Sequence, residues 1–136
     1  MLFEAELSVD EGLGKSISLC RDAIKELQGS APGDNLTFIT DDMKEGILAA
    51  HVCPATRLHS IVAATVSPHE NSGSSILLRS GALGWPPTYD GGENEKILQK
   101  IIDDLGQYAN VTVVRPIHSP VSVFPPWRGP LSIKVP

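Results

Sequence analysis

Three residues near the middle of the chain have side chains that bind transition metals. His51 and Cys53 are two positions apart in an apolar run, so on a strand they share one face within reach of one ion. If Cys53 pairs near Leu58 across the following turn, however, His59 falls on the opposite face. No C-x-x-C or H-x-x-x-H spacing accompanies these residues. We therefore expect no metal ion and no other cofactor.

The pair His51 and Cys53 also has the composition of a thiol nucleophile beside a base. Cys53 precedes Pro54, and it lacks the glycine-rich turn or helix N-terminus that usually activates a thiolate. The glycines between Gly81 and Gly92 match neither the G-x-x-x-x-G-K-S/T nor the G-x-G-x-x-G phosphate-binding pattern. We assign no catalytic residue and favour a protein that is not an enzyme.

Two segments combine aromatic residues with prolines. Residues 86–89 match the P-P-x-Y pattern that WW domains bind in an extended polyproline conformation. Residues 125–128 put a tryptophan beside an arginine, a combination common at the centre of interfaces. The alternative is intramolecular, with Trp85 and Tyr89 pinning their loop and Trp127 capping the sheet. The residues assigned to binding are Trp85, Pro86, Pro87, Tyr89, Phe124, Trp127 and Arg128.

Hydrophobic periodicity predicts the elements that would position these side chains. Residues 1–9 alternate as a half-buried strand does, and an S-x-x-E capping box at Ser8 and Glu11 predicts a helix start. Apolar residues three and four apart continue that helix, and a second helical stripe covers residues 98–108. Between the helices, strands are predicted at 36–40, 47–52, 58–66 and 75–80.

The predicted order is β-α-β-β-β-β-α. Because strands joined by short turns pair antiparallel, we expect an α+β fold with a single antiparallel sheet of about five strands and two helices on one face. TBP-like and helix-grip-like domains have a similar order, and that likeness rests on element order alone.

The charge distribution divides the chain into an α+β body, residues 1–110, and a proline-rich basic tail, residues 111–136. The body has eight Lys and Arg against sixteen Asp and Glu, whereas the tail has three basic residues, no acidic ones and six prolines. An acidic body repels phosphate, so we expect no nucleic-acid partner. The apolar runs are too short to span a bilayer and no targeting signal is visible, so we expect no membrane partner and a cytoplasmic location. The tail is expected to be an extended arm that wraps the body or binds a partner.

The predicted third and fourth strands are apolar on both faces. With Cys53 paired near Leu58, one face would carry Leu48, Val52, His59, Ile61 and Ala63, and we assign these residues to a binding surface. Helices on one side bury only one face, so a second cover is expected. The tail, a second copy of the chain, or an apolar ligand in a pocket are the three alternatives.

The interpretation that follows is a non-enzymatic interaction or assembly module, a homo-oligomer or partner-binding protein that self-associates through its sheet or its C-terminal arm. The alternative is a small apolar-ligand binder, or a small enzyme, with a pocket between sheet and helix.

Overall fold

The computed structural model describes residues 2–30, 32–53, 59–70, 73–82 and 92–119. It confirms the α+β class with one antiparallel sheet and two helices, and it has six strands where about five were expected. In chain order the elements are β1 (Leu2–Val9), α1 (Leu13–Lys25), β2 (Asn35–Asp42), β3 (Ile47–Cys53), β4 (Ser60–Pro68), β5 (Ser74–Ala82), α2 (Glu93–Tyr108) and β6 (Val111–His118).

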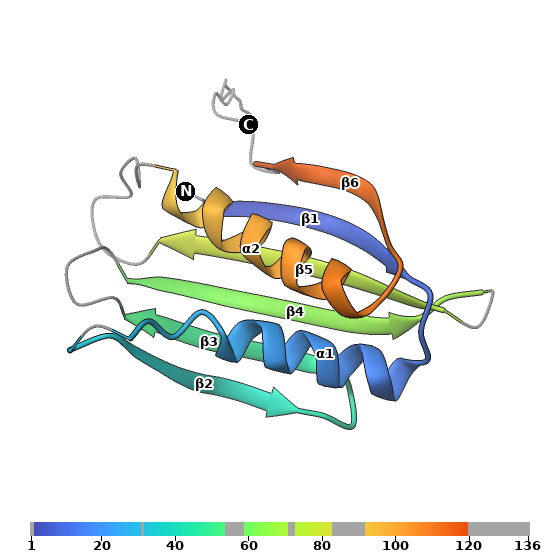
Figure 1. Ribbon diagram of the computed structural model, residues 1–136, viewed down its shortest axis with the longest axis horizontal. Coiled ribbons are helices and arrows are strands. Elements are labelled where there is room, and N and C mark those ends of the chain that lie inside the picture. The colour runs from blue at the N-terminus through green and yellow to red at the C-terminus, as the bar shows by residue number, and fades with distance from the viewer. Residues whose placement is uncertain (1, 31, 54–58, 71–72, 83–91, 120–136) are drawn as a thin grey trace, which may run out of the picture.

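The strands are arranged in the order β2-β3-β4-β5-β1-β6, so the first strand lies inside the sheet between β5 and the last strand (Figure 1). β2 to β5 follow one another as hairpins, and each pairs antiparallel with its neighbour. β1 pairs antiparallel with both β5 and β6. The two edges of the sheet are therefore β2 and β6.

The sixth strand comes from the segment that was assigned to the C-terminal arm. Val111–His118 continues directly from α2 and pairs along β1. It contains Pro116, and a proline is tolerated on an edge strand, where one side needs no N–H donor. Residues 120–136 of the tail lie outside the described residues.

Both helices lie side by side on one face of the sheet (Figure 1). The apolar stripe of α1 is buried at Ile17, Cys20 and Ile24, and that of α2 at Leu98, Ile101 and Leu105. Lys100 Nζ of α2 donates to the Glu26 carbonyl at the end of α1, with a separation of 2.6 Å. A lysine at this place satisfies a free carbonyl and complements the negative end of the helix dipole.

The expected capping box at the start of α1 is wrong. The N-cap residue is Gly12, and it makes no side-chain capping hydrogen bond. Ser8 instead belongs to β1, because the strand extends to Val9. The Glu11 carbonyl accepts from two serine hydroxyls, Ser16 Oγ at 3.4 Å and Ser74 Oγ at 2.9 Å, and so joins the helix start to β5.

A single core fills the space between the sheet and the helices. Five of the largest side chains that the strands contribute to it are completely buried, and these are Leu7, Leu48, Val62, Ile76 and Leu78. Ser80 Oγ of β5 also hydrogen-bonds Asn94 Oδ1 near the start of α2, and both residues are buried. The part of the sheet–helix interface that is described here is therefore packed with side chains, as protein interiors are.

A β-bulge in β2 links the edge of the sheet to α1. The register with β3 shifts between Phe38 and Thr40, so Asp41 comes to lie opposite the buried Leu48. There Asp41 accepts hydrogen bonds from the Arg21 guanidinium at 2.9 to 3.0 Å, and Arg21 also stands 5.0 Å from the Phe38 ring centroid. Hydrogen bonding to Arg21 is the main reason that the pKa of Asp41 lies below its usual value.

Candidate functional site

The face of the sheet that turns away from the helices is the candidate functional surface, and we call it the outer face. Its side chains form rows across the strands. Two rows run through all six strands, and one of them contains Thr40, Ala49, Ala63, Arg79, Glu4 and His118. The other contains Asp42, Ile47, Thr65, Leu77, Glu6 and Arg115. No helix in the described part of the chain covers these rows (Figure 1).

The pairing of β3 with β4 corrects the expected register by one residue. Val52 pairs with Ser60 and His51 with Ile61, so Cys53 falls opposite His59 rather than Leu58. Because side chains alternate along a strand, this shift exchanges the faces of every β4 residue relative to β3. Leu48 and Val52 consequently belong to the core under the helices, whereas His59, Ile61 and Ala63 belong to the outer face.

An apolar patch occupies the middle of the outer face. Ala49 and Ala63 are direct cross-strand partners there. None of the outward positions of β3 and β4 carries Asp, Glu, Lys or Arg. Ile47, the first residue of β3, is 45% exposed. The patch comprises Ile47, Ala49, Ile61, Ala63 and Leu77.

Charged residues border the patch on the side of β1 and β6. Glu4 is only 8% exposed, although it points outward, because Arg79 and His118 lie on either side of it. Arg79 Nε is 3.3 Å from Glu4 Oε2, and His118 Nε2 is 3.8 Å from Glu4 Oε1. His118 Nδ1 donates to the Pro116 carbonyl at 2.8 Å, which orients the ring toward Glu4. This border is thus held in place by a short chain of polar contacts.

A shallow hollow of about 450 Å³ opens on the outer face and overlaps the patch at Ile61 and Ala63. Gly81 lies between Ile61 of β4 and Leu2 of β1 in one cross-strand row, and it has no side chain to fill that position. The missing side chain explains the depression, whose lining is Leu2, Ile61, Ala63, Arg79, Ser80, Gly81 and Ala82.

His51, Cys53 and His59 come together at one end of the same face. Cys53 Sγ lies 3.1 Å from His51 Nε2 and 3.7 Å from His59 Nδ1. The two imidazole rings meet edge to face with centroids 5.2 Å apart. The expectation that His59 lies on the opposite face from Cys53 is therefore wrong, and the three residues form one cluster.

The second cysteine has a different environment. Cys20 is completely buried in the core on α1, and burial raises the pKa of its thiol to about 12. Cys53 is only partly buried. Of the two thiols, Cys53 is the one that solvent and ligands reach.

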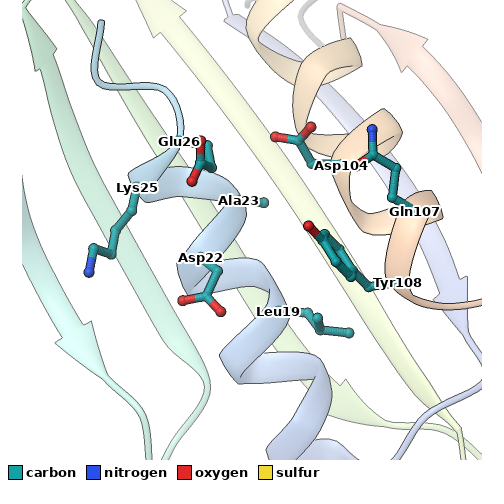
Figure 2. Close-up of a pocket in the computed structure, with 8 residues that line it drawn as sticks. All are labelled: Leu19, Asp22, Ala23, Lys25, Glu26, Asp104, Gln107 and Tyr108. Atoms are coloured by element: carbon teal, nitrogen blue, oxygen red, sulfur yellow. The ribbon is translucent and has the colours of Figure 1, made fainter. Parts of the chain in front are cut away.

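A second hollow, of about 500 Å³, lies between the exposed sides of α1 and α2. Figure 2 shows Tyr108 directed from α2 toward α1, with Glu26 and Asp104 at the other end of the groove and Lys25 pointing away from it. Asp104 Oδ2 is buried and has no hydrogen-bond partner in the described part of the protein. Three of the eight lining residues are acidic and one is basic, so this groove is less suited to an apolar ligand than an apolar pocket would be.

One alternative from the sequence was a ligand pocket between the sheet and the helices. In the described residues, that space is occupied by the buried side chains of the core. Both hollows described above instead open at the surface, one on the outer face and one between the helices.

The remaining residues assigned to binding cannot be positioned. Trp85, Pro86, Pro87 and Tyr89 fall in 83–91, and Phe124, Trp127 and Arg128 fall in 120–136, both outside the described residues.

None of the helices that the structure describes is long and apolar enough to cross a bilayer.

Comparison with known proteins identifies no family. No family model matches the chain, and no curated protein matches its sequence. A solved structure from Deinococcus radiodurans is similar with a TM-score of 0.48 and 12% identity, covering 79% of this chain and 93% of that one. Ara h 8.0201 has a TM-score of 0.47 and 11% identity, covering 79% of this chain and 98% of its own.

A third similar structure is the exocytosis-sensitive phosphoprotein pp63/parafusin, a phosphoglucomutase from Paramecium, in its open form. Its TM-score is 0.45 with 9% identity, covering 82% of this chain and only 22% of that chain. Similarity at this level carries no inference about function, which must be argued from the surface itself.

Proposed function

We propose that this protein is a non-enzymatic assembly module that binds a second copy of itself through the outer face of its sheet. The observation that carries the proposal is the apolar patch around the Ala49 and Ala63 pair, which no helix in the described part of the chain covers. An antiparallel sheet with one solvated face normally carries polar side chains there. Contiguous apolar surface of this kind usually marks an interaction site.

The composition of the patch favours an identical partner. Its outward positions on β3 and β4 carry no carboxylate, ammonium or guanidinium group, so two copies meet there without like-charge repulsion. The small side chains of Ala49 and Ala63 permit the two sheets to approach closely, at the spacing of about 10 Å that packed sheets adopt. A twofold axis through the patch makes this surface its own complement.

The two edges of the sheet are less suitable for self-association. The edge strand β2 is interrupted by the bulge between Phe38 and Thr40. The other edge, β6, contains Pro116 and has irregular register with β1. Bulges and prolines are features that prevent pairing between sheet edges. Docking through the face rather than an edge is therefore the economical arrangement.

The size of the face approaches that of a standard dimer interface. Strands about 4.8 Å apart and about 3.3 Å per residue give a face of roughly 25 by 26 Å, or about 650 Å². A standard interface buries about 800 Å² on each partner. A copy that covers the whole face therefore forms an interface near the lower end of the stable range, consistent with a reversible dimer.

Sedimentation equilibrium of the full chain tests the proposal. The 14.5 kDa chain is expected to show concentration-dependent doubling of its mass, and Ala63→Glu is expected to abolish the doubling by putting a charge at the centre of the patch. Gln28→Glu adds the same charge at an exposed site beyond α1 and is expected to leave association unchanged. A monomer at every concentration, or equal association of both variants, contradicts the proposal.

Truncation shows whether the sheet or the C-terminal arm binds the second copy. The cut must follow Ser119, because removing residues from 111 onward also removes strand β6. If the outer face binds the second copy, the truncated chain still dimerises. Loss of dimerisation on truncation, with Ala63→Glu still dimeric, assigns assembly to the arm instead.

The alternative of a small apolar ligand has one supporting observation, the hollow beside Gly81. Its volume of about 450 Å³ lies within the range of roughly 300 to 1,000 Å³ for ligand sites. A monomeric protein whose melting temperature rises with a particular lipid or apolar metabolite, and does so less in Ile61→Lys, would assign the hollow to that ligand in place of a second copy.

A further inference from the structure

The cluster of His51, Cys53 and His59 plays no part in the apolar patch, although it lies on the same face. The ligand atoms of these three residues all lie within 4.8 Å of one another. Two of the residues are partly buried and His59 is exposed, so solvent reaches the group. Such a convergence of imidazole and thiol groups needs an explanation of its own.

The sheet itself holds the three side chains in position. His51 and Cys53 are alternate residues of β3, so both project from the outer face. β3 and β4 pair from Ile47 with Thr65 up to Val52 with Ser60. Continuing this register puts His59 directly opposite Cys53. Two ligands therefore come from one rigid strand, and the third comes from the first position before the neighbouring strand.

The distances resemble those of a metal site before the ion is bound. A tetrahedral Zn²⁺ ion with bonds of about 2.3 Å to sulfur and about 2.05 Å to nitrogen puts sulfur and nitrogen about 3.6 Å apart. Cys53 Sγ is 3.1 Å from His51 Nε2 and 3.7 Å from His59 Nδ1. Both separations lie within about 0.5 Å of that value, and all three ligand atoms lie within 4.8 Å of one another.

The chemistry of the ligands selects the class of ion. One thiolate and two imidazoles are borderline to soft donors, which suit Zn²⁺ and its neighbours in the transition series. Mg²⁺ and Ca²⁺ require oxygen ligands, and the group contains no carboxylate. Within the described residues the group has three members, which leaves the fourth position of a tetrahedral ion for water.

We propose that His51, Cys53 and His59 form a binding site for one Zn²⁺ ion on the outer face of the sheet. The thiolate of Cys53 and one ring nitrogen from each histidine are the protein ligands, and water completes the coordination. Self-association is not required for this site, since all three ligands belong to one chain.

Titration of the full chain with Zn²⁺ against a chromogenic chelator tests the site. One equivalent is expected to bind, and Cys53→Ser and His59→Gln are each expected to weaken binding by more than the 10- to 100-fold that losing an outer-shell partner costs. Cys20→Ala and His69→Gln remove the same residue types outside the cluster and are expected to bind as wild type does. Equal affinity in all five proteins overturns the proposal.

Alkylation of Cys53 provides a readout on the unmodified protein, so that a variant that fails to fold does not decide the matter. Zn²⁺ is expected to slow the reaction of this thiol with iodoacetamide severalfold, and a chelator is expected to restore the rate. An unchanged alkylation rate in excess Zn²⁺ overturns the proposal, because it means that the Cys53 thiol is not a ligand. The cluster would then be a hydrogen-bonded pair of His51 and Cys53 beside His59. Ala63→Glu is expected not to self-associate, so the same measurement on this variant removes any protection that a second copy provides. Zn²⁺ must still slow the alkylation of Cys53 there if the thiol is a metal ligand.

Discussion

Cys53 and His59 face each other across the end of the β3–β4 hairpin, with Cys53 Sγ 3.7 Å from His59 Nδ1. The contact exists because the two strands pair in one particular register. It leaves the thiol of Cys53 on the open side of the sheet, whereas Cys20 is enclosed by the core. The two cysteines should consequently behave very differently toward reagents.

A thiol-reactive dye distinguishes the two cysteines. We expect one thiol to react in the native protein and both to react in denaturant, because Cys20 is completely buried and its pKa is raised to about 12. Cys53→Ser should abolish the native reaction, while Cys20→Ala should preserve it. Rapid reaction of Cys20 in the native state would mean that α1 does not pack as described.

Two neighbouring residues of β3 test the assignment of its faces. Leu48→Ala should lower the free energy of unfolding by about 2 to 5 kcal/mol, since Leu48 is completely buried beneath the helices. Ile47→Ala should cost less than about 1 kcal/mol, because Ile47 is 45% exposed on the other face. Urea unfolding at low protein concentration measures both. The opposite ranking would put Leu48 on the exposed binding surface to which it was assigned from the sequence.

A glycine in the turn between β2 and β3 tests the hairpin. Gly46 has a φ of 74°, and a Cβ there would lie 2.6 Å from the Val66 carbonyl oxygen. Gly46→Ala should therefore destabilise the protein by about 1 to 3 kcal/mol through backbone strain and the clash. Gly106→Ala in α2 meets nothing within 4 Å and should instead stabilise by about 0.5 to 1 kcal/mol. Thermal unfolding of the two variants provides the comparison.

The ion pair between Arg21 and Asp41 gives a dependence of stability on pH. Hydrogen bonds from Arg21 hold the pKa of Asp41 below its ordinary value of 3.8. Because the folded pKa is the lower one, the pair stabilises the fold above pH 3.8, and this contribution is lost as the pH falls through the folded pKa. Asp41→Asn should thus be less stable than wild type at neutral pH and equally stable in strong acid. Glu70→Gln, which removes an exposed carboxylate, should show no such difference at either pH.

The sequence was sufficient for the elements and for the covered face of several of them. The alternation of Phe3, Ala5, Leu7 and Val9 correctly indicated a buried side of β1. Local spacing also found both helical stripes. These features depend on periodicity within one element, and the printed sequence contains that periodicity in full.

The register of β3 and β4 could not be obtained in the same way. Ile61 and Ala63 are as apolar as Val62 and Ala64, so hydrophobic alternation does not distinguish the two possible pairings. The shift by one residue separated His59 from Cys53 in the sequence interpretation, and the structure brings them together. A chain with one polar face on β4 would have revealed the cluster from its sequence.

Strand β6 was missed for a related reason. The six prolines of the tail and its missing acidic residues made residues 111–136 look like one arm, but Val111 to Val114 is a β-prone run next to the end of α2. Its partner, β1, is distant in the sequence. Pairing between distant segments is a property of the assembled sheet, so composition alone does not reveal it.

Solvent access to methyl groups measures most directly whether the outer face is covered. In the single chain, Ile47 on the outer face is 45% exposed and Leu13 on the helical side is 36% exposed, so a soluble paramagnetic agent should relax the Ile47 methyls at least as strongly. Self-association through the outer face reverses this order in a concentrated sample, with Ile47 protected and Leu13 unaffected, and dilution restores it. Ile47 methyls that remain as accessible as those of Leu13 at every concentration would contradict the proposed assembly.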